Sequence, residues 1–240
     1  MIKEALQYIV GLGKTETIEI EGRVYSTSQI MPVKHPETVP LCISTLNSLV
    51  QYIQRDFDKV ALNPTNPLVI HVVSPTLVKA FTPFYGEFKQ RDVLLEVSPV
   101  LPSLRFGEYK SQEQFVIEMQ SKFVDTQDKP LLLQLAGNLK DEMIRTMEDD
   151  GVSQVATVKA GVAKVADVVV PNPVTLAPYR TFLEVDQPSS KFIFRIKEGG
   201  QLALFEADGG AWQYEAISNI KKYLENELSC RNKERIVILS

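Results

Sequence analysis

The hydrophobic pattern of the first hundred residues predicts one long helix and two strands. Residues 41–57 have apolar side chains three and four positions apart, typical of an amphipathic helix: Leu46, Leu49, Val50, Ile53 and Phe57. Residues 67–74 form an unbroken apolar run bounded by prolines, which predicts a buried strand. Residues 91–99 predict a second strand.

Two more helices are expected between residues 111 and 151. Ser111 and Gln114 have the spacing of a capping box, in which each side chain bonds the backbone of the other residue, so a helix should open over residues 112–124. Pro130 is expected to start the next helix and Gly151 to close it.

The pattern changes beyond Gly151. Residues 152–170 are rich in valine, with Gly161 where a hairpin bend is expected, and the prolines of residues 171–178 predict a break. Beyond them, alternating patterns predict an antiparallel meander with one buried face, then a helix and a last short strand. The predicted ranges are 181–185, 191–197 and 201–207 for the meander, 216–229 for the helix and 235–239 for the last strand.

Helices and strands are grouped along the chain instead of alternating regularly, which favours an α+β fold over a doubly wound one. We expect a mixed helix and strand lobe over residues 1–150 and a β-rich lobe with a C-terminal helix over residues 151–240. A chain of 240 residues can form one large core, so the two lobes are expected to make one continuous structural unit.

The stretch Gly13-Lys14-Thr15 matches the end of a phosphate-binding loop. Such a loop needs another glycine five positions before Gly13, where this chain has Tyr8. The order of elements also differs, because a helical pattern at 4–10 precedes the stretch and a strand pattern at 17–26 follows it. We therefore interpret these glycines as the end of a helix rather than a nucleotide site.

Composition and charge narrow the classes of function. Apolar residues make up 44% and charged residues 23%, as in ordinary globular proteins. Residues 1–150 hold 15 Lys and Arg against 20 Asp and Glu, and residues 151–240 hold 11 against 10, so neither half should bind duplex nucleic acid by charge alone. No secretory signal and no apolar run of about 20 residues is present, so we expect a soluble cytoplasmic protein without membrane contact.

Residue types suited to catalysis are few. The chain has two histidines, two cysteines far apart, and no serine in the G-x-S-x-G pattern, so we predict no catalytic residue, no metal site and no cofactor. His71 is expected to be buried against a backbone group, with a base in a pocket as the alternative. The acidic residues 148–150 suggest a divalent ion site, a partner surface or a solvated helix end.

Aromatic and basic residues intermixed in one loop are the best candidates for a ligand site. Residues 80–92 contain four aromatic rings among cations, and such rings suit stacking on a base. The alternative is that the rings close the core between the two flanking strands. Arg105, Phe106 and Tyr109 form a second, smaller set. The predicted ligand-binding residues are Phe84, Tyr85, Lys89, Arg91, Arg105 and Tyr109.

The order of these elements resembles the YfdQ-like family of phage and prophage proteins. The resemblance covers the helix at 46–57, the strand at 67–74, the capped helix at 111–119 and the proline-led β region at 168–185. The family is functionally uncharacterised, so it implies no catalytic residues. It implies a viral setting in the host cytoplasm, where such genes often accompany recombination or host-interaction functions.

These observations lead to the hypothesis of a phage-encoded, non-catalytic binding protein. We expect a homo-oligomer, because the valine-rich residues 152–170 are apolar enough to need covering. Its expected ligand is a nucleotide, a single-stranded nucleic acid or a host protein, in a role such as recombination accessory or host-defence antagonist. Two alternatives stay open: a metal-dependent enzyme that acts on nucleotides or phosphodiesters through His71 and residues 148–150, and a structural virion component.

Overall fold

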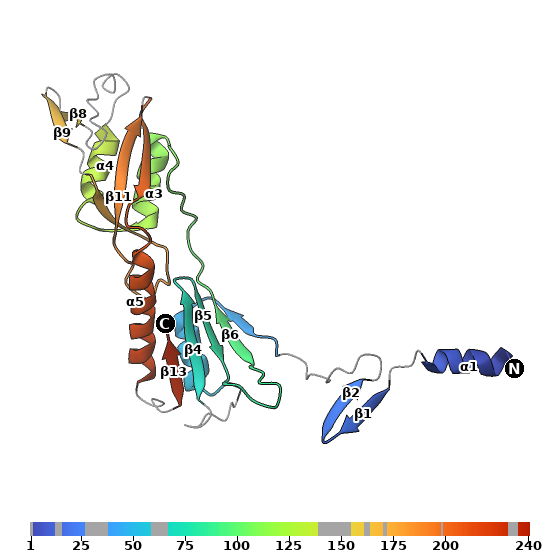
Figure 1. The fold of residues 1–240 in the computed structure, drawn as a ribbon. Helices are drawn as coiled ribbons and strands as arrows, with labels where there is room; N and C mark the ends of the chain where they lie inside the picture. Colours follow the sequence, from blue (N-terminus) through green and yellow to red (C-terminus); the bar gives the residue numbers. More distant parts are fainter. Residues whose placement is uncertain are drawn as a thin grey trace.

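The protein has an α+β fold, as predicted, with two lobes stacked end to end and the N-terminal elements to one side (Figure 1). This computed structural model describes residues 2–12, 16–26, 38–58, 67–138, 155–160, 164–169, 172–197, 199–229 and 235–240. Within these ranges no helix has the length and apolar character needed to span a bilayer.

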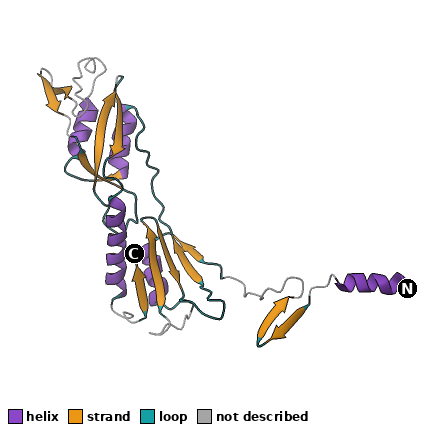
Figure 2. Ribbon diagram, viewed as in Figure 1, coloured by secondary structure: helices purple, strands orange, loops and turns teal. Residues whose placement is uncertain are grey.

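The first lobe, here called the five-stranded lobe, is a mixed sheet in the order β13-β4-β5-β6-β3. The pairs β4–β5 and β5–β6 are antiparallel, whereas β13 is parallel to β4 and β3 is parallel to β6. Helices α2 and α5 pack on one face of this sheet (Figure 2). The bounds are β3 (Leu41–Ile43), α2 (Leu46–Gln54), β4 (Leu68–Ser74), β5 (Leu77–Phe81), β6 (Val93–Val97), α5 (Trp212–Leu228) and β13 (Ile236–Leu239).

The second lobe, the four-stranded lobe, is an antiparallel sheet in the order β12-β11-β10-β7. Its core forms where Phe192, Phe194 and Ile196 of β11 meet apolar side chains of α3 and α4. The alternation along β11 confirms the predicted buried face. The bounds are α3 (Gln112–Lys122), β7 (Phe123–Val124), α4 (Lys129–Asn138), β10 (Val174–Pro178), β11 (Ser190–Lys197) and β12 (Gln201–Glu206).

The four-stranded lobe is inserted into the five-stranded one. The chain builds β3 to β6, leaves to form the second lobe, and returns through α5 to finish with β13 beside β4. Each core cluster therefore combines residues from before and after residue 150. The predicted lobe boundary at residue 150 itself lies outside the described residues.

Two small hairpins complete the fold. Helix α1 (Ile2–Leu12) is followed by β1 (Thr17–Ile20) and β2 (Arg23–Ser26), which confirms the predicted helix-to-strand order, although Gly13 to Thr15 lie outside the described residues. The valine-rich segment contributes β8 (Val155–Ala160) and β9 (Lys164–Val169), which pair antiparallel. Gly161 between them is also outside the described part.

The predicted helix over residues 41–57 was too long at both ends. Residues 41–43 form strand β3, and the helix begins at Leu46 because Thr45 caps it, its Oγ1 accepting a hydrogen bond of 3.1 Å from the Ser48 amide. Phe57 lies beyond the helix end and is exposed instead of belonging to the buried face.

The start of the β meander was also wrong. The proline-rich stretch read as a break contains strand β10, which tolerates Pro178 because this residue ends the strand opposite the two-residue strand β7. Residues 181–185, predicted as a strand, form a turn instead. The side chain of Gln187 satisfies the backbone of that turn, accepting from the amides of Arg180 and Thr181 and donating to the Phe182 carbonyl.

The other predicted elements are confirmed. Strands β4, β6 and β13 lie where the patterns placed them, and helix α5 covers the predicted range as far as Leu228 but already begins at Trp212 instead of Ala216. Ser111 caps α3, accepting a 3.3 Å hydrogen bond from the Gln114 amide. Helix α4 starts at Lys129, one residue before Pro130, and is described as far as Asn138, so its predicted end at Gly151 lies outside the described residues.

Candidate functional site

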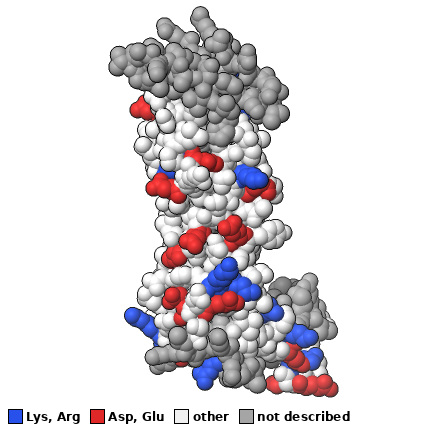
Figure 3. Space-filling view, turned by 90° about the vertical axis from the view of Figure 1, so that its left-hand side faces the viewer, with Lys and Arg blue, Asp and Glu red and all other residues white. Residues whose placement is uncertain are grey.

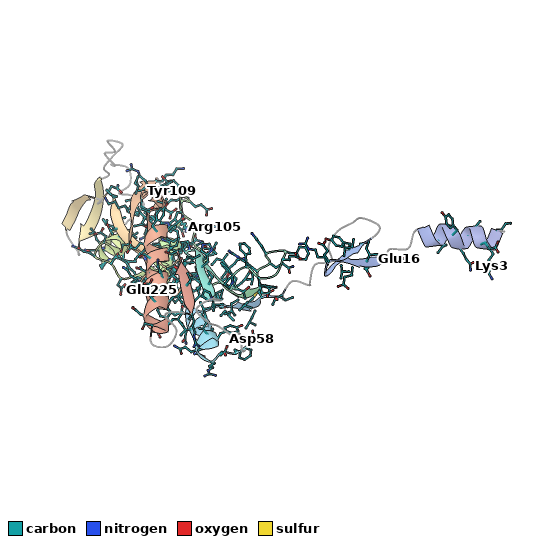
Figure 4. All side chains as sticks on the ribbon, turned by 60° about the horizontal axis from the view of Figure 1, so that its bottom comes forward. Lys3, Glu16, Asp58, Arg105, Tyr109 and Glu225 are labelled. Carbon is teal, nitrogen blue, oxygen red and sulfur yellow. The ribbon has the colours of Figure 1, made fainter. Side chains whose placement is uncertain are left out.

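The predicted ligand-binding residues fall at two separate places. Phe84, Tyr85, Lys89 and Arg91 belong to the β5–β6 loop, residues 82–92, at the end of the five-stranded lobe. Arg105 and Tyr109 lie on the connection between β6 and α3, against the four-stranded lobe (Figure 4). The structure therefore divides the predicted set in two.

In the β5–β6 loop the aromatic rings and the cation contact each other. The Arg91 guanidinium carbon lies 3.9 Å from the Phe84 ring centroid and 5.1 Å from that of Phe81. Backbone hydrogen bonds of 3.0 and 3.1 Å between Tyr85 and Gln90 close the loop. The rings of Phe84, Tyr85 and Phe88 are exposed and belong to neither core cluster.

The same loop contacts segments from the N-terminal part of the chain. Thr38 Oγ1 donates a 2.7 Å hydrogen bond to Asp92, and Arg23 of β2 forms an ion pair with Glu87. A hydrogen bond with Asp92 is the main cause that raises the pKa of Tyr85. Tyr85, Glu87 and Asp92 are therefore engaged in contacts within the chain.

Arg105 and Tyr109 line a surface groove beside α3, here called the α3 groove. The connection pairs with the free edge of β12, where Lys110 and Leu202 exchange backbone hydrogen bonds of 2.9 Å, and this pairing holds it alongside the helix. The groove has a volume of about 580 Å³. It is lined by Ser103, Arg105, Glu108, Tyr109, Lys110, Gln114, Ile117, Glu118 and Lys122.

A carboxylate between two lysines organises the floor of the α3 groove. Glu118 of α3 pairs with Lys110 and, at 3.1 Å, with Lys122. Lys110 Nζ also donates to the Arg105 carbonyl at 3.0 Å, and Lys122 Nζ to that of Ser103 at 2.8 Å. Burial alone would raise the pKa of Glu118, but the hydrogen bonds and charges of the two lysines outweigh burial and hold the pKa below its ordinary value.

We expect Glu118→Gln to lower the free energy of unfolding at pH 7 by about 1–2 kcal/mol, because it removes charge-assisted hydrogen bonds from two lysines. The Glu118 pKa is lower in the folded than in the unfolded chain, so the stabilisation is complete above the ordinary value of 4.5 and is lost as pH falls through the folded-state pKa. Urea unfolding of the wild type and of Glu118→Gln at decreasing pH measures the difference between their free energies of unfolding. A difference that stays constant well below pH 4.5 would contradict the assignment.

Tyr109 gives the α3 groove an aromatic wall next to positive charge. Its ring meets Phe205 edge to face at 6.1 Å, and Lys197 Nζ lies 5.5 Å from the ring centroid. With Lys197, the groove and its rim carry four cations against the two carboxylates of Glu108 and Glu118. The groove is therefore locally positive in a chain whose net charge is −4.

Charges elsewhere on the surface are mixed. Figure 3 shows the side of the molecule that lies on the left in Figure 1, and its described residues intersperse acidic and basic side chains without a continuous patch of one sign. A phosphate chain would find no extended basic track on this face.

The sequence interpretation missed Lys110, Glu118, Lys122 and Lys197. The spacing of Glu118 and Lys122, four residues apart on a capped helix, was a readable signal for an ion pair. Lys110 and Lys197 reach the groove through strand pairing with β12, which no local pattern specifies.

Of the residues considered for catalysis, the structure describes only His71. His71 lies in the middle of β4 and is half-buried instead of buried as expected. It is on the sheet face opposite α2 and α5, because its neighbours Ile70 and Val72 point into the core. The acidic residues 148–150 lie outside the described residues. Within the described ranges, no three His, Cys, Asp or Glu side chains form a group that could hold a metal ion.

Comparisons of this chain with protein-family models, with curated proteins and with solved structures found no match. The resemblance to the YfdQ-like family stays a prediction. Function is therefore inferred from the geometry of the described residues.

Proposed function

We propose that this is a phage-encoded, non-catalytic binding protein whose α3 groove takes a nucleotide or a short single-stranded nucleic acid. The observation that carries the proposal is the α3 groove itself, in which Arg105, Lys110 and Lys122 surround a hollow of about 580 Å³ beside the ring of Tyr109. Cations suit phosphate and an aromatic wall suits a base.

The lysines of the groove keep capacity for a phosphate. An ammonium group has three N–H donors, and Lys110 and Lys122 each use two of them, one on Glu118 and one on a backbone carbonyl. One donor on each lysine therefore remains for a ligand oxygen. Arg105, whose side chain is 73% exposed and whose ion pair with Glu108 is long at 4.0 Å, adds a planar fork suited to phosphate.

The α3 groove suits this ligand better than the β5–β6 loop does. In the loop, Arg91 lies 3.9 Å from the Phe84 ring centroid, so a base would have to displace the cation from the ring, whereas Lys197 stands further from the Tyr109 ring, at 5.5 Å. The groove's volume lies within the range of about 300–1,000 Å³ of small-molecule sites, and its net charge, although positive, is too small to bind a duplex by counterion release.

We expect Tyr109→Ala to weaken binding of a fluorescent oligothymidylate about 5- to 150-fold, because loss of one stacked base costs about 1–3 kcal/mol. Arg105→Ala should also reduce the salt dependence of the dissociation constant by about 0.7 in log–log slope for one lost phosphate contact. Fluorescence anisotropy titrations over a range of salt concentrations measure both effects.

Two further variants make this titration decisive. Tyr214→Ala removes an exposed ring of α5 away from the groove and should leave the affinity unchanged. Tyr85→Ala tests the β5–β6 loop. If Tyr85→Ala weakens binding and Tyr109→Ala does not, the ligand binds at the loop and the groove assignment is wrong. Failure of the wild type to bind any oligonucleotide or nucleotide would reject the proposal.

A further inference from the structure

Among the described residues, no helix packs on one face of the five-stranded sheet. Helices α2 and α5 both pack on the face formed by residues such as Ile70, Ala80 and Leu95 (Figure 1). The opposite face, here called the open sheet face, presents half-buried or exposed side chains, with Val73, Val237 and Leu239 exposed by 40–46%. Its residues are Cys42, Val69, His71, Val73, Lys79, Phe81, Glu96, Val237 and Leu239.

A transverse row of side chains crosses this face. In the strand register Leu239 lies beside His71, His71 beside Lys79, Lys79 beside Glu96, and Glu96 beside Cys42. At the centre of the row Lys79 Nζ and Glu96 Oε1 form an ion pair of 2.6 Å, each side chain about one third exposed. The face thus combines a central charge pair with an apolar surround.

We propose that the open sheet face packs against the same face of a second copy of this chain. A sheet that buries one face normally leaves a polar second face to solvent. Several apolar side chains on that second face therefore favour a covering layer. The apolar positions on the open sheet face depart from this pattern.

The charge pair at the centre is complementary to itself, which points to a second copy as the occupant. A two-fold axis parallel to the strands and between β5 and β6 exchanges the positions of these strands in the facing sheet. Lys79 of one copy then lies over Glu96 of the other, and Glu96 over Lys79. A two-fold interface requires such a self-complementary pattern, and a face with one sign of charge would repel its copy.

The size of the face predicts the strength of the dimer. Five strands about 4.8 Å apart and about five residues long cover roughly 400 Å² of flat area in each copy. Two copies bury roughly 800 Å² before the pleat is counted, below the roughly 1,200–2,000 Å² of stable specific interfaces and in the range of weak, transient ones. We therefore expect a dimer that dissociates on dilution through the micromolar range.

Charge reversal tests this arrangement independently of folding. Lys79→Glu gives a face with two negative charges and Glu96→Lys a face with two positive charges, so each variant alone should sediment as a monomer. An equimolar mixture should restore the wild-type proportion of dimer, because opposite faces then meet. Loss of the internal Lys79–Glu96 pair affects each chain equally in the pure variants and in the mixture, so it cannot produce this recovery.

Sedimentation velocity over a series of concentrations, with circular dichroism to verify folding, measures these states. Val73→Asp, at an exposed position of the same face, should also give a monomer, and Tyr214→Asp on α5 should dimerise like the wild type. A monomeric wild type at high concentration, or a mixture that stays monomeric, would overturn the proposal. So would single variants that dimerise like the wild type. The α3 groove lies in the other lobe, so oligonucleotide binding is a separate readout.

Discussion

Replacing Phe182 with alanine is expected to lower the free energy of unfolding by about 3–5 kcal/mol, the usual cost of removing a buried phenyl ring. Phe182 is 0% exposed and lies in the turn between β10 and β11 of the four-stranded lobe. Its ring nevertheless belongs to the core of the five-stranded lobe, with residues of α2 and α5. The variant therefore opens a cavity in one lobe and loosens the attachment of the other.

The next residue provides the control for this prediction. Leu183 is 64% exposed, so Leu183→Ala should change the free energy of unfolding by less than about 0.5 kcal/mol. Urea unfolding followed by circular dichroism and by the fluorescence of the single tryptophan, Trp212, measures both variants. A loss below about 1 kcal/mol for Phe182→Ala would show that this ring does not join the lobes.

The Phe182 turn is also where sequence interpretation failed for an identifiable reason. Its alternating apolar residues fit a strand, and Phe182 and Val185 are indeed buried. A turn can be buried here because the Gln187 side chain satisfies its backbone. The buried Thr181 hydroxyl is satisfied as well, because Thr181 Oγ1 donates to the Pro75 carbonyl at 2.6 Å. Partners 6 and 106 residues away do not appear in a local pattern.

The predictable parts of the fold were those with local causes. Alternation along β11, the Ser111 cap and the apolar face of α5 depend on residues a few positions apart, and each was read correctly. The pairing of β13 with β4 joins the two ends of the five-stranded lobe across an entire inserted lobe. Nothing in either strand's own pattern specifies its neighbour.

The candidate site, too, was predictable from the sequence only in part. Arg105 and Tyr109 were selected because cations and aromatic rings stood close together in the chain, and they line one groove. Phe84 and Arg91 were selected by the same rule, but the loop closes so that the two side chains contact each other. Spacing in the sequence shows that aromatic and basic residues lie near each other in the chain. The path of the folded backbone determines whether their side chains face a ligand or contact one another.

The second large effect is expected at the junction of the lobes, where Arg180→Ala should lower the free energy of unfolding by about 3 kcal/mol. Arg180 is 7% exposed, its guanidinium lies 3.9 Å from the Trp212 ring, and it bonds Glu206 at 2.8 Å and also Ser190. Burial lowers the pKa of Arg180 to about 10, and the charges of Glu206 and Asp208 offset this only in part. The residue nevertheless remains charged at neutral pH.

The solvent exposure of Glu206, the ion-pair partner of Arg180, determines how much stability Arg180→Ala removes. Breaking a buried ion pair costs about 3–5 kcal/mol when the remaining charge is stranded. The Glu206 side chain is 43% exposed and can regain water, so the lower end of that range applies to Arg180→Ala. The expected cost comes from the lost stacking on Trp212, the unpaired Ser190 hydroxyl and the cavity left by the arginine. Arg105→Ala, which removes a largely exposed arginine, should cost less than about 0.5 kcal/mol.

A double-mutant cycle separates the ion pair from the packing. Glu206→Ala alone should cost about 1–3 kcal/mol, because it leaves the buried Arg180 charge with fewer partners. Arg180→Ala and Glu206→Ala combined should cost less than the sum of the two, since the second change removes a group that the first has already deprived of its partner. Additive costs within about 0.5 kcal/mol would mean that Arg180 stabilises the junction through Trp212 and Phe192 alone, as a packed ring contact rather than an ion pair.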